Sequence, residues 1–292
     1  MPSTRDIRRR IRSVKNTAQI TKAMQMVAAS KMRKAQQAAL AGRPYAALMN
    51  QVLGNVTGYA GDFTHPLMEK REVRKRCVIL ISTDKGLCGA LNSNLMREAA
   101  RFPKETTVYI TAGRKAAQFV ARTRRQLSAE FTYKDAPLFS EARAICKFAR
   151  DLFLKGEVDE VQILFTNFIS TLNQRPETLP LLPVAELKGV VAGVHGHETS
   201  QELMRGSTEF LFEPSPEEVL GALLPHYLNF RVYQILLEAK ASEHSARMVA
   251  MKNATDNAKQ LIKDLTLEYN KLRQASITKE LLEIASAAMA LG

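Results

Sequence analysis

The stretch SEHSARMVAMKNATDNAKQLIKDLTLEYNKLRQASITKELL, residues 242–282, decides the fold of this chain. It contains neither proline nor glycine, so nothing in it has to end a helix. Its apolar side chains recur at steps of three and four residues, as on one face of a helix: Ala258, Leu261, Ile262, Leu265, Tyr269 and Leu272. The pattern extends from about Glu217 to the last residues, which predicts a helix of roughly 70 residues and about 105 Å. A helix of that length cannot bury its apolar face inside a compact domain, so it needs a partner helix.

The other end of the chain offers that partner. From Thr4 to about Val56 the sequence again has the pattern of one long helix. Its apolar and small side chains follow a mostly heptad spacing: Ile7, Ile11, Val14, Ala18, Thr21, Met24, Ala28, Met32 and Ala35. Two terminal helices around a globular middle predict a long antiparallel coiled coil.

The middle of the chain has the pattern of an α/β domain. Residues 77–81 form a continuous apolar run typical of a strand buried on both faces, and further strands are expected at 107–110, 161–169 and 179–184. Helices are expected from about Ala90, at 115–122 and at 139–154. Strands that alternate with helices predict a largely parallel, Rossmann-like sheet. The expected domains are therefore a coiled-coil helix over 1–60, an α/β domain over 70–210 and a second coiled-coil helix over 215–292.

Prolines mark the ends of the long helices. Ser215, Pro216 and Glu218 occupy the positions of an N-cap, a first helical residue and the third residue of a capping box. Pro225 lies about two turns further on and Pro44 lies in the first helix, so both are expected to bend their helices.

Charge is unevenly distributed along the chain. The formal net charge is +13, and the first 50 residues hold one acidic residue, Asp6. The basic residues of that segment are Arg5, Arg8, Arg9, Arg10, Arg12, Lys15, Lys22, Lys31, Arg33, Lys34 and Arg43. Such a stripe predicts an acidic partner, which could be a nucleic acid, a membrane surface or an acidic protein. A plain solvated helix face is the alternative.

Composition places the chain among soluble proteins. Hydrophobic residues make up 46% and charged residues 24%, and no apolar run approaches the roughly 20 residues of a membrane span. The N-terminus has basic residues but no apolar signal-peptide core. The cysteines, Cys77, Cys88 and Cys146, are odd in number and lie in apolar contexts, which indicates reduced structural thiols in a cytoplasmic compartment.

The chain carries no clear catalytic, cofactor-binding or metal-binding pattern. The turn STDKGLCG at residues 82–89 lacks the Lys-Ser or Lys-Thr of a P-loop and is better read as a strand-to-helix turn. His195 and His197 have no further ligand nearby for a metal, and Cys88 has no histidine close in sequence. We therefore expect no catalytic residue, no cofactor and no metal in this chain.

Three segments resemble the γ subunit of bacterial F-type ATP synthase. They are IRRRIRSVKNTAQITKAMQMVAASKMRKAQ at 7–36, STDKGLCGALN at 82–92, and the stretch from Ser242 extended to Ile284. The resemblance implies a central rotor shaft in the F1 sector, which couples ion-driven rotation of the c-ring to ATP synthesis or hydrolysis at the β subunits. It implies one copy in a complex with α, β and ε subunits and the c-ring, peripheral on the cytoplasmic face of the bacterial inner membrane.

The resemblance also implies roles for individual residues. Arg273, Gln274 and Thr278 match the family segment that meets the β subunit, and Lys22 and Met24 match a segment of the opposing helix near the same region. At the foot of the shaft, which faces the c-ring and ε, the matching residues are Arg43, Tyr45, Phe210, Phe212 and Glu213. The family often has tyrosine at the positions of Phe210 and Phe212, so any hydrogen bond there is absent in this chain.

Two other functions remain compatible with parts of the sequence. The first is a basic coiled-coil protein that binds nucleic acid, although aromatic content is only 7% and there is no Trp. The second is a small nucleotide-binding enzyme built on the middle domain.

Overall fold

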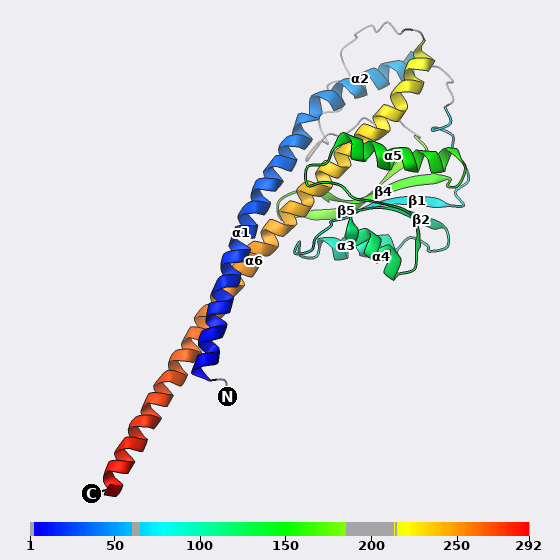
Figure 1. The fold of residues 1–292 in the computed structure, drawn as a ribbon. Coiled ribbons are helices and arrows are strands. Elements are labelled where there is room, and N and C mark those ends of the chain that lie inside the picture. The colour runs from blue at the N-terminus through cyan, green and yellow to red at the C-terminus, as the bar shows by residue number, and fades with distance from the viewer. Residues whose placement is uncertain (1–2, 60–64, 185–212, 214, 292) are drawn as a thin grey trace. The chain divides into compact units, whose positions relative to one another are not determined.

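The computed structural model describes residues 3–59, 65–184, 213 and 215–291 (Figure 1). The chain divides into two compact units, Met1–Val27 with Met248–Gly292, and Ala28–Arg247. Helix α6, Pro216–Leu291, and helix α1, Thr4–Ala41, contribute to both units. The predicted domain bounds of 1–60, 70–210 and 215–292 stay a prediction, because each compact unit contains only part of α1 and of α6 and so does not follow the bounds of the helices.

The first unit is an antiparallel pair of helices. Its direction follows from two contacts: Arg8 on α1 donates a hydrogen bond to Tyr269 on α6, while Thr21 lies opposite Thr255 at 2.7 Å between the hydroxyl oxygens. A row of buried and half-buried α6 positions alternates steps of four and three residues: Met251, Thr255, Ala258, Ile262, Leu265, Tyr269 and Leu272. Leu261 was expected on this face but is 38% exposed, since it lies one position off the heptad seam.

The second unit contains a five-stranded sheet in the order β3-β2-β1-β4-β5. The strands are β1 Arg76–Ile81, β2 Thr107–Ala112, β3 Gln126–Phe131, β4 Glu160–Phe168 and β5 Gln174–Leu182. Pairs β1–β2, β1–β4 and β2–β3 are parallel, and β4–β5 is antiparallel. The α/β fold class is therefore confirmed, with one antiparallel edge strand on an otherwise parallel sheet.

Helices cover both faces of this sheet. Helix α5, Phe139–Leu154, lies on one face, while α3, Leu91–Ala100, and α4, Arg114–Arg122, lie on the other (Figure 1). Strand β1 serves both cores, because Cys77, Ile79 and Ile81 point to the α5 side and Val78 and Leu80 to the α3 and α4 side. The continuous apolar run of this strand is thus explained by burial on both faces.

Two strand predictions needed correction. Strand β3 was not predicted, although QLSAEF alternates polar and apolar residues, because the pattern covers only six residues and belongs to an edge strand that leaves Gln126, Leu127 and Ser128 exposed. Strand β5 begins at Gln174, five residues earlier than expected. Its two prolines, Pro176 and Pro180, are tolerated since β5 is an edge strand with one unpaired side.

The first helix is interrupted where the sequence pattern suggested one continuous element. Helix α1 ends at Ala41 and α2, Arg43–Tyr59, begins two residues later. A Cβ at Gly42 would lie 2.1 Å from Nε2 of Gln234 on α6, so the absence of a side chain lets α6 approach this break closely. Pro44 lacks an N–H and therefore cannot donate the helix bond that would join the two helices. By contrast, α6 continues through Pro225.

The start of α6 agrees with the predicted cap. The helix begins at Pro216, and the backbone N–H of Glu218 donates to the hydroxyl of Ser215 at 3.3 Å. Ser215 therefore satisfies one of the donors that a helix leaves unpaired at its start.

Candidate functional site

The residues expected to meet the β subunit lie on two surfaces of the helix pair. Lys22, Arg273, Gln274 and Thr278 are exposed and Met24 is half-buried. Because Thr21 lies opposite Thr255, Lys22 and Met24 are roughly five turns of α6 away from Arg273. The structure therefore does not bring the two groups together, contrary to the expectation that they lie near the same region.

The C-terminal end of α6 extends past the start of α1. Since Arg8 contacts Tyr269 and α1 begins at Thr4, residues from about 274 onward have no helix beside them among the described residues of this unit. Several large apolar side chains are exposed there: Ile277 at 49%, Leu281 at 62%, Leu282 at 65%, Ile284 at 67% and Met289 at 84%. Exposed apolar surface of this extent marks an interaction site.

The predicted foot residues are only partly described. Tyr45 on α2 is 41% exposed, its hydroxyl contacts the ring nitrogen Nε2 of His226, and its ring lies 4.6 Å from that of Phe230. Partial burial raises the pKa of Tyr45. Arg43 is the first residue of α2 and Glu213 is exposed just before α6, whereas Phe210 and Phe212 lie outside the described residues.

The turn after β1 is held by the chain itself. A guanidinium nitrogen of Arg247 on α6 donates to the backbone oxygens of Lys85 and Gly86 at 3.4 and 3.3 Å. The carboxylate of Asp84 accepts the backbone N–H of Arg114 at 2.9 Å. These contacts give the turn a structural role at the carboxyl edge of the sheet.

None of the cysteines has the environment of a nucleophile. All three are buried, and burial raises the pKa of Cys88 and takes the pKa of Cys77 and Cys146 to about 12. Within the described ranges, no group of three His, Cys, Asp or Glu side chains is placed to hold a metal ion. His195 and His197 lie outside those ranges.

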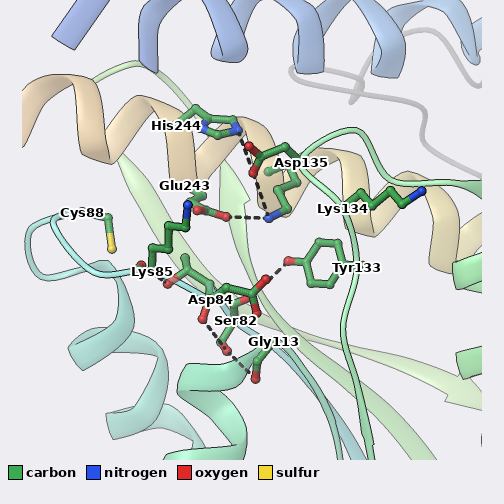
Figure 2. Close-up of polar contacts among 12 residues, drawn as sticks. Ser82, Asp84, Lys85, Cys88, Gly113, Tyr133, Lys134, Asp135, Glu243 and His244 are labelled. Atoms are coloured by element: carbon green, nitrogen blue, oxygen red, sulfur yellow. Dashed lines mark hydrogen bonds and ion pairs between the residues drawn. The ribbon is translucent and has the colours of Figure 1, made fainter. Parts of the chain in front are cut away.

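A partly buried ion network was not anticipated from the sequence (Figure 2). Lys240 is 2% exposed, and its ammonium lies 3.0 Å from Glu243 and 3.7 Å from Asp135. Arg247 contacts Glu243 at 2.8 Å, and Lys31 on α1 donates to Asp135. That hydrogen bond from Lys31, together with the Lys240 charge, lowers the pKa of Asp135 although burial acts against it. The signal was available, since Lys240, Glu243 and Arg247 continue the three-and-four spacing of the apolar α6 face.

These features define a class of protein in which the two terminal helices of the chain pair in antiparallel fashion and an α/β domain is inserted between them in the sequence. In the described part of the chain, none of the helices combines the length and apolar character that a membrane span requires. A family model described as ATP synthase matches residues 3–291.

Relatives of known name match over nearly the whole chain. The ATP synthase gamma chain of Opitutus terrae is 52% identical, with 99% of each chain covered, and that of Methylacidiphilum infernorum is 47% identical with 100% of each covered. The chain belongs to the ATP synthase gamma chain family. These matches give no support to the nucleic-acid-binding alternative.

Solved structures share the fold. A chain of the Tetrahymena thermophila mitochondrial ATP synthase central stalk and c-ring structure matches with a TM-score of 0.60 and 25% identity, covering 80% of this chain and 99% of that one. A chain of the Euglena gracilis mitochondrial ATP synthase structure matches with a TM-score of 0.68 and 20% identity, covering 99% and 94%.

Proposed function

We propose that this chain is the central rotor shaft of the F1 sector of an ATP synthase. The observation that carries the proposal is the C-terminal end of α6, where Ile277, Leu281, Leu282, Ile284 and Met289 are exposed on a stretch of helix that has no neighbour among the described residues of its unit. Isolated in water, such a helix would expose apolar surface at a free-energy cost. A ring of α and β subunits around it supplies the missing contacts and leaves the helix free to turn.

The shaft itself performs no bond chemistry in this proposal. Nucleotide is bound and hydrolysed on the β subunits, and the shaft changes their affinities by presenting a different face to each in turn. Two observations support a mechanical role: the three cysteines are buried, and the turn at residues 82–89 accepts a hydrogen bond from Arg247 of the same chain.

The partners follow from charge and position. Arg273, Gln274 and Thr278, with Lys22 and Met24 on the other helix, contact the β subunits. The basic residues of α1 from Arg5 to Lys34 are all exposed, which favours attraction to acidic surfaces of a surrounding ring. Arg43, Tyr45, Phe210, Phe212 and Glu213 belong to the foot that contacts ε and the c-ring. The complex holds one copy of the chain, peripheral on the cytoplasmic face of a bacterial inner membrane.

Reconstitution tests this function. The purified chain is mixed with α and β subunits of the same organism, and complex formation and ATP hydrolysis are followed together. We expect a stable complex with one copy of the chain and hydrolysis well above that of α and β alone. A folded chain that neither joins the complex nor stimulates hydrolysis would refute the rotor function.

A further inference from the structure

Polar contacts fasten one short segment of α6 to the carboxyl edge of the sheet. Arg247 donates to the turn after β1, at the backbone oxygens of Lys85 and Gly86. The hydroxyl of Ser245 donates to the backbone oxygen of Thr171, in the turn between β4 and β5, at 2.9 Å. Lys240 reaches the segment after β3 through Asp135. Residues 240–247 thus contact all three loops that follow β1, β3 and β4.

Asp135 is the point where three elements meet. Its carboxylate lies after β3, accepts from Lys31 on α1 and lies 3.7 Å from the ammonium of Lys240 on α6. Lys240 also lies 4.4 Å above the ring of Tyr133, and the Tyr133 hydroxyl donates to the backbone oxygen of Ser82 at 3.1 Å. The two long helices and the sheet are therefore joined through one carboxylate. We call Asp135, Lys240, Glu243 and Arg247 the α6 lock.

Two charges of the lock, those of Lys240 and Glu243, are buried at positions where apolar side chains of similar size would stabilise the fold equally well. The side chain of Lys240 is 2% exposed and that of Glu243 5% exposed. Removing two ions from water costs about as much as their mutual attraction returns, so a buried pair is weak evidence for stability. Such a pair instead fixes the relative orientation of the two elements that it joins, because charge-assisted hydrogen bonds require particular distances and angles. Apolar packing alone permits a helix to rotate and slide more easily.

We propose that the α6 lock is the torsional fastening of the rotor, which fixes the rotational position of α6 against the sheet and transfers torque from the α/β domain into the helices. This proposal rests on the rotor function proposed above and assigns Asp135 and Lys240 as positioning residues for it. Torque acts tangentially on a helix, and charge-assisted contacts with directional preference add to the resistance of packed side chains against rotation about the helix axis. Lys31 extends the fastening to α1, so both helices turn with the domain.

The test uses the whole ATP synthase in membrane vesicles, with ion transport measured per ATP hydrolysed. Asp135→Ala removes a half-exposed carboxylate without leaving a cavity. Lys240→Met keeps the volume of a buried side chain and removes its charge. In both variants we expect transport per ATP to fall by about fivefold, the factor that a change of about 1 kcal/mol produces. Asp135→Glu retains the carboxylate and should restore most of the ratio.

The controls separate torque transfer from folding and from the rotor function. Glu98→Ala removes a surface ion pair of similar length, between Glu98 on α3 and Arg101 just after it at 2.8 Å, and should leave the ratio unchanged. The ratio is taken over assembled complexes, so a variant that merely folds poorly gives fewer complexes with a normal ratio. Wild-type transport per ATP in Asp135→Ala or Lys240→Met would overturn the lock. A wild-type chain that supports no coupled transport would instead overturn the rotor function.

Discussion

Gly113 is the residue whose replacement we expect to damage the α/β domain most. Its φ of +104° is unfavourable for residues with a side chain, and a Cβ there would lie 2.3 Å from the backbone oxygen of Ser82. Ser82 cannot move aside easily, because its hydroxyl accepts a hydrogen bond from the backbone N–H of Ala116 at 2.7 Å. We expect Gly113→Ala to lower the free energy of unfolding by about 3 kcal/mol or more, through backbone strain together with overpacking. Urea unfolding of the purified chain measures it.

Gly156 provides the matched control. Its φ is +72°, but nothing lies within 4 Å of the position of an added Cβ. Gly156→Ala therefore adds strain without collision and should cost only about 1–2 kcal/mol. Equal losses in the two variants would show that the contact with Ser82 is unimportant.

His244 should make the stability of the α/β unit depend on pH. Burial is the largest cause that lowers its pKa from 6.5 to about 4, against the raising effect of the Glu243 and Asp135 charges. Between these pH values the unfolded chain binds the proton more readily than the folded one, so acidification favours unfolding. The contribution of neutral His244 to the free energy of unfolding should thus be complete above pH 6.5 and should decline as the pH falls to about 4.

His244→Gln separates this effect from those of other groups, because glutamine does not titrate. Urea midpoints measured between pH 7 and pH 4.5 should decline less steeply for the variant than for the wild type. Asp135 titrates below its ordinary value of 3.8 and so does not contribute to this window. Parallel curves for the two proteins would contradict the assignment to His244.

At the scale of elements, continuity of α6 through the helix pair carries a prediction. Lys259 is exposed, so its side chain contributes little to packing, whereas its backbone lies between the seam residues Ala258 and Ile262. Lys259→Pro removes a helix hydrogen bond and introduces a clash at a cost of about 3 kcal/mol or more. We expect impaired assembly with α and β subunits, while Lys259→Ala assembles normally. Normal assembly of the proline variant would mean that the pair tolerates a break there.

The elements that could be predicted from the sequence are those whose burial pattern repeats. The seam of α1 and α6 follows a heptad spacing, and β1 is buried on both faces, so both leave a clear pattern of apolar residues. Strand β3 leaves a weaker pattern, because its polar–apolar alternation covers only six residues of an exposed edge held by backbone hydrogen bonds to β2. The break between α1 and α2 has a local sign in Pro44, whereas the close approach of Gln234 to Gly42, from about 190 residues further along the chain, has none.

At the scale of the whole molecule, the candidate site could be predicted only where its sequence matches a segment of the family. Resemblance singled out Arg273 and Gln274, and both lie on the exposed surface of α6. The α6 lock was missed because its members lie in segments more than 100 residues apart, at Asp135 and at Lys240 to Arg247. The local sign of the lock was that charged residues occupy α6 positions where the periodicity predicts apolar core residues. Such residues indicate an ion pair only once an oppositely charged side chain from another element is known to lie beside them.

The last prediction concerns what α6 does to the complex rather than to its own chain. Arg273 and Gln274 are exposed, so Arg273→Ala with Gln274→Ala should change the stability of the chain by less than about 0.5 kcal/mol. In the complex, loss of two orientation-dependent hydrogen-bonding side chains should lower the rate of ATP synthesis by about fivefold or more, at about 1 kcal/mol for each hydrogen bond. Lys263→Ala with Glu268→Ala removes two exposed side chains from the same helix and should leave synthesis unchanged. If both double variants synthesise ATP at the wild-type rate, Arg273 and Gln274 do not act as a latch on the β subunit. If both are equally slow, the loss reflects the helix surface as a whole rather than these two side chains.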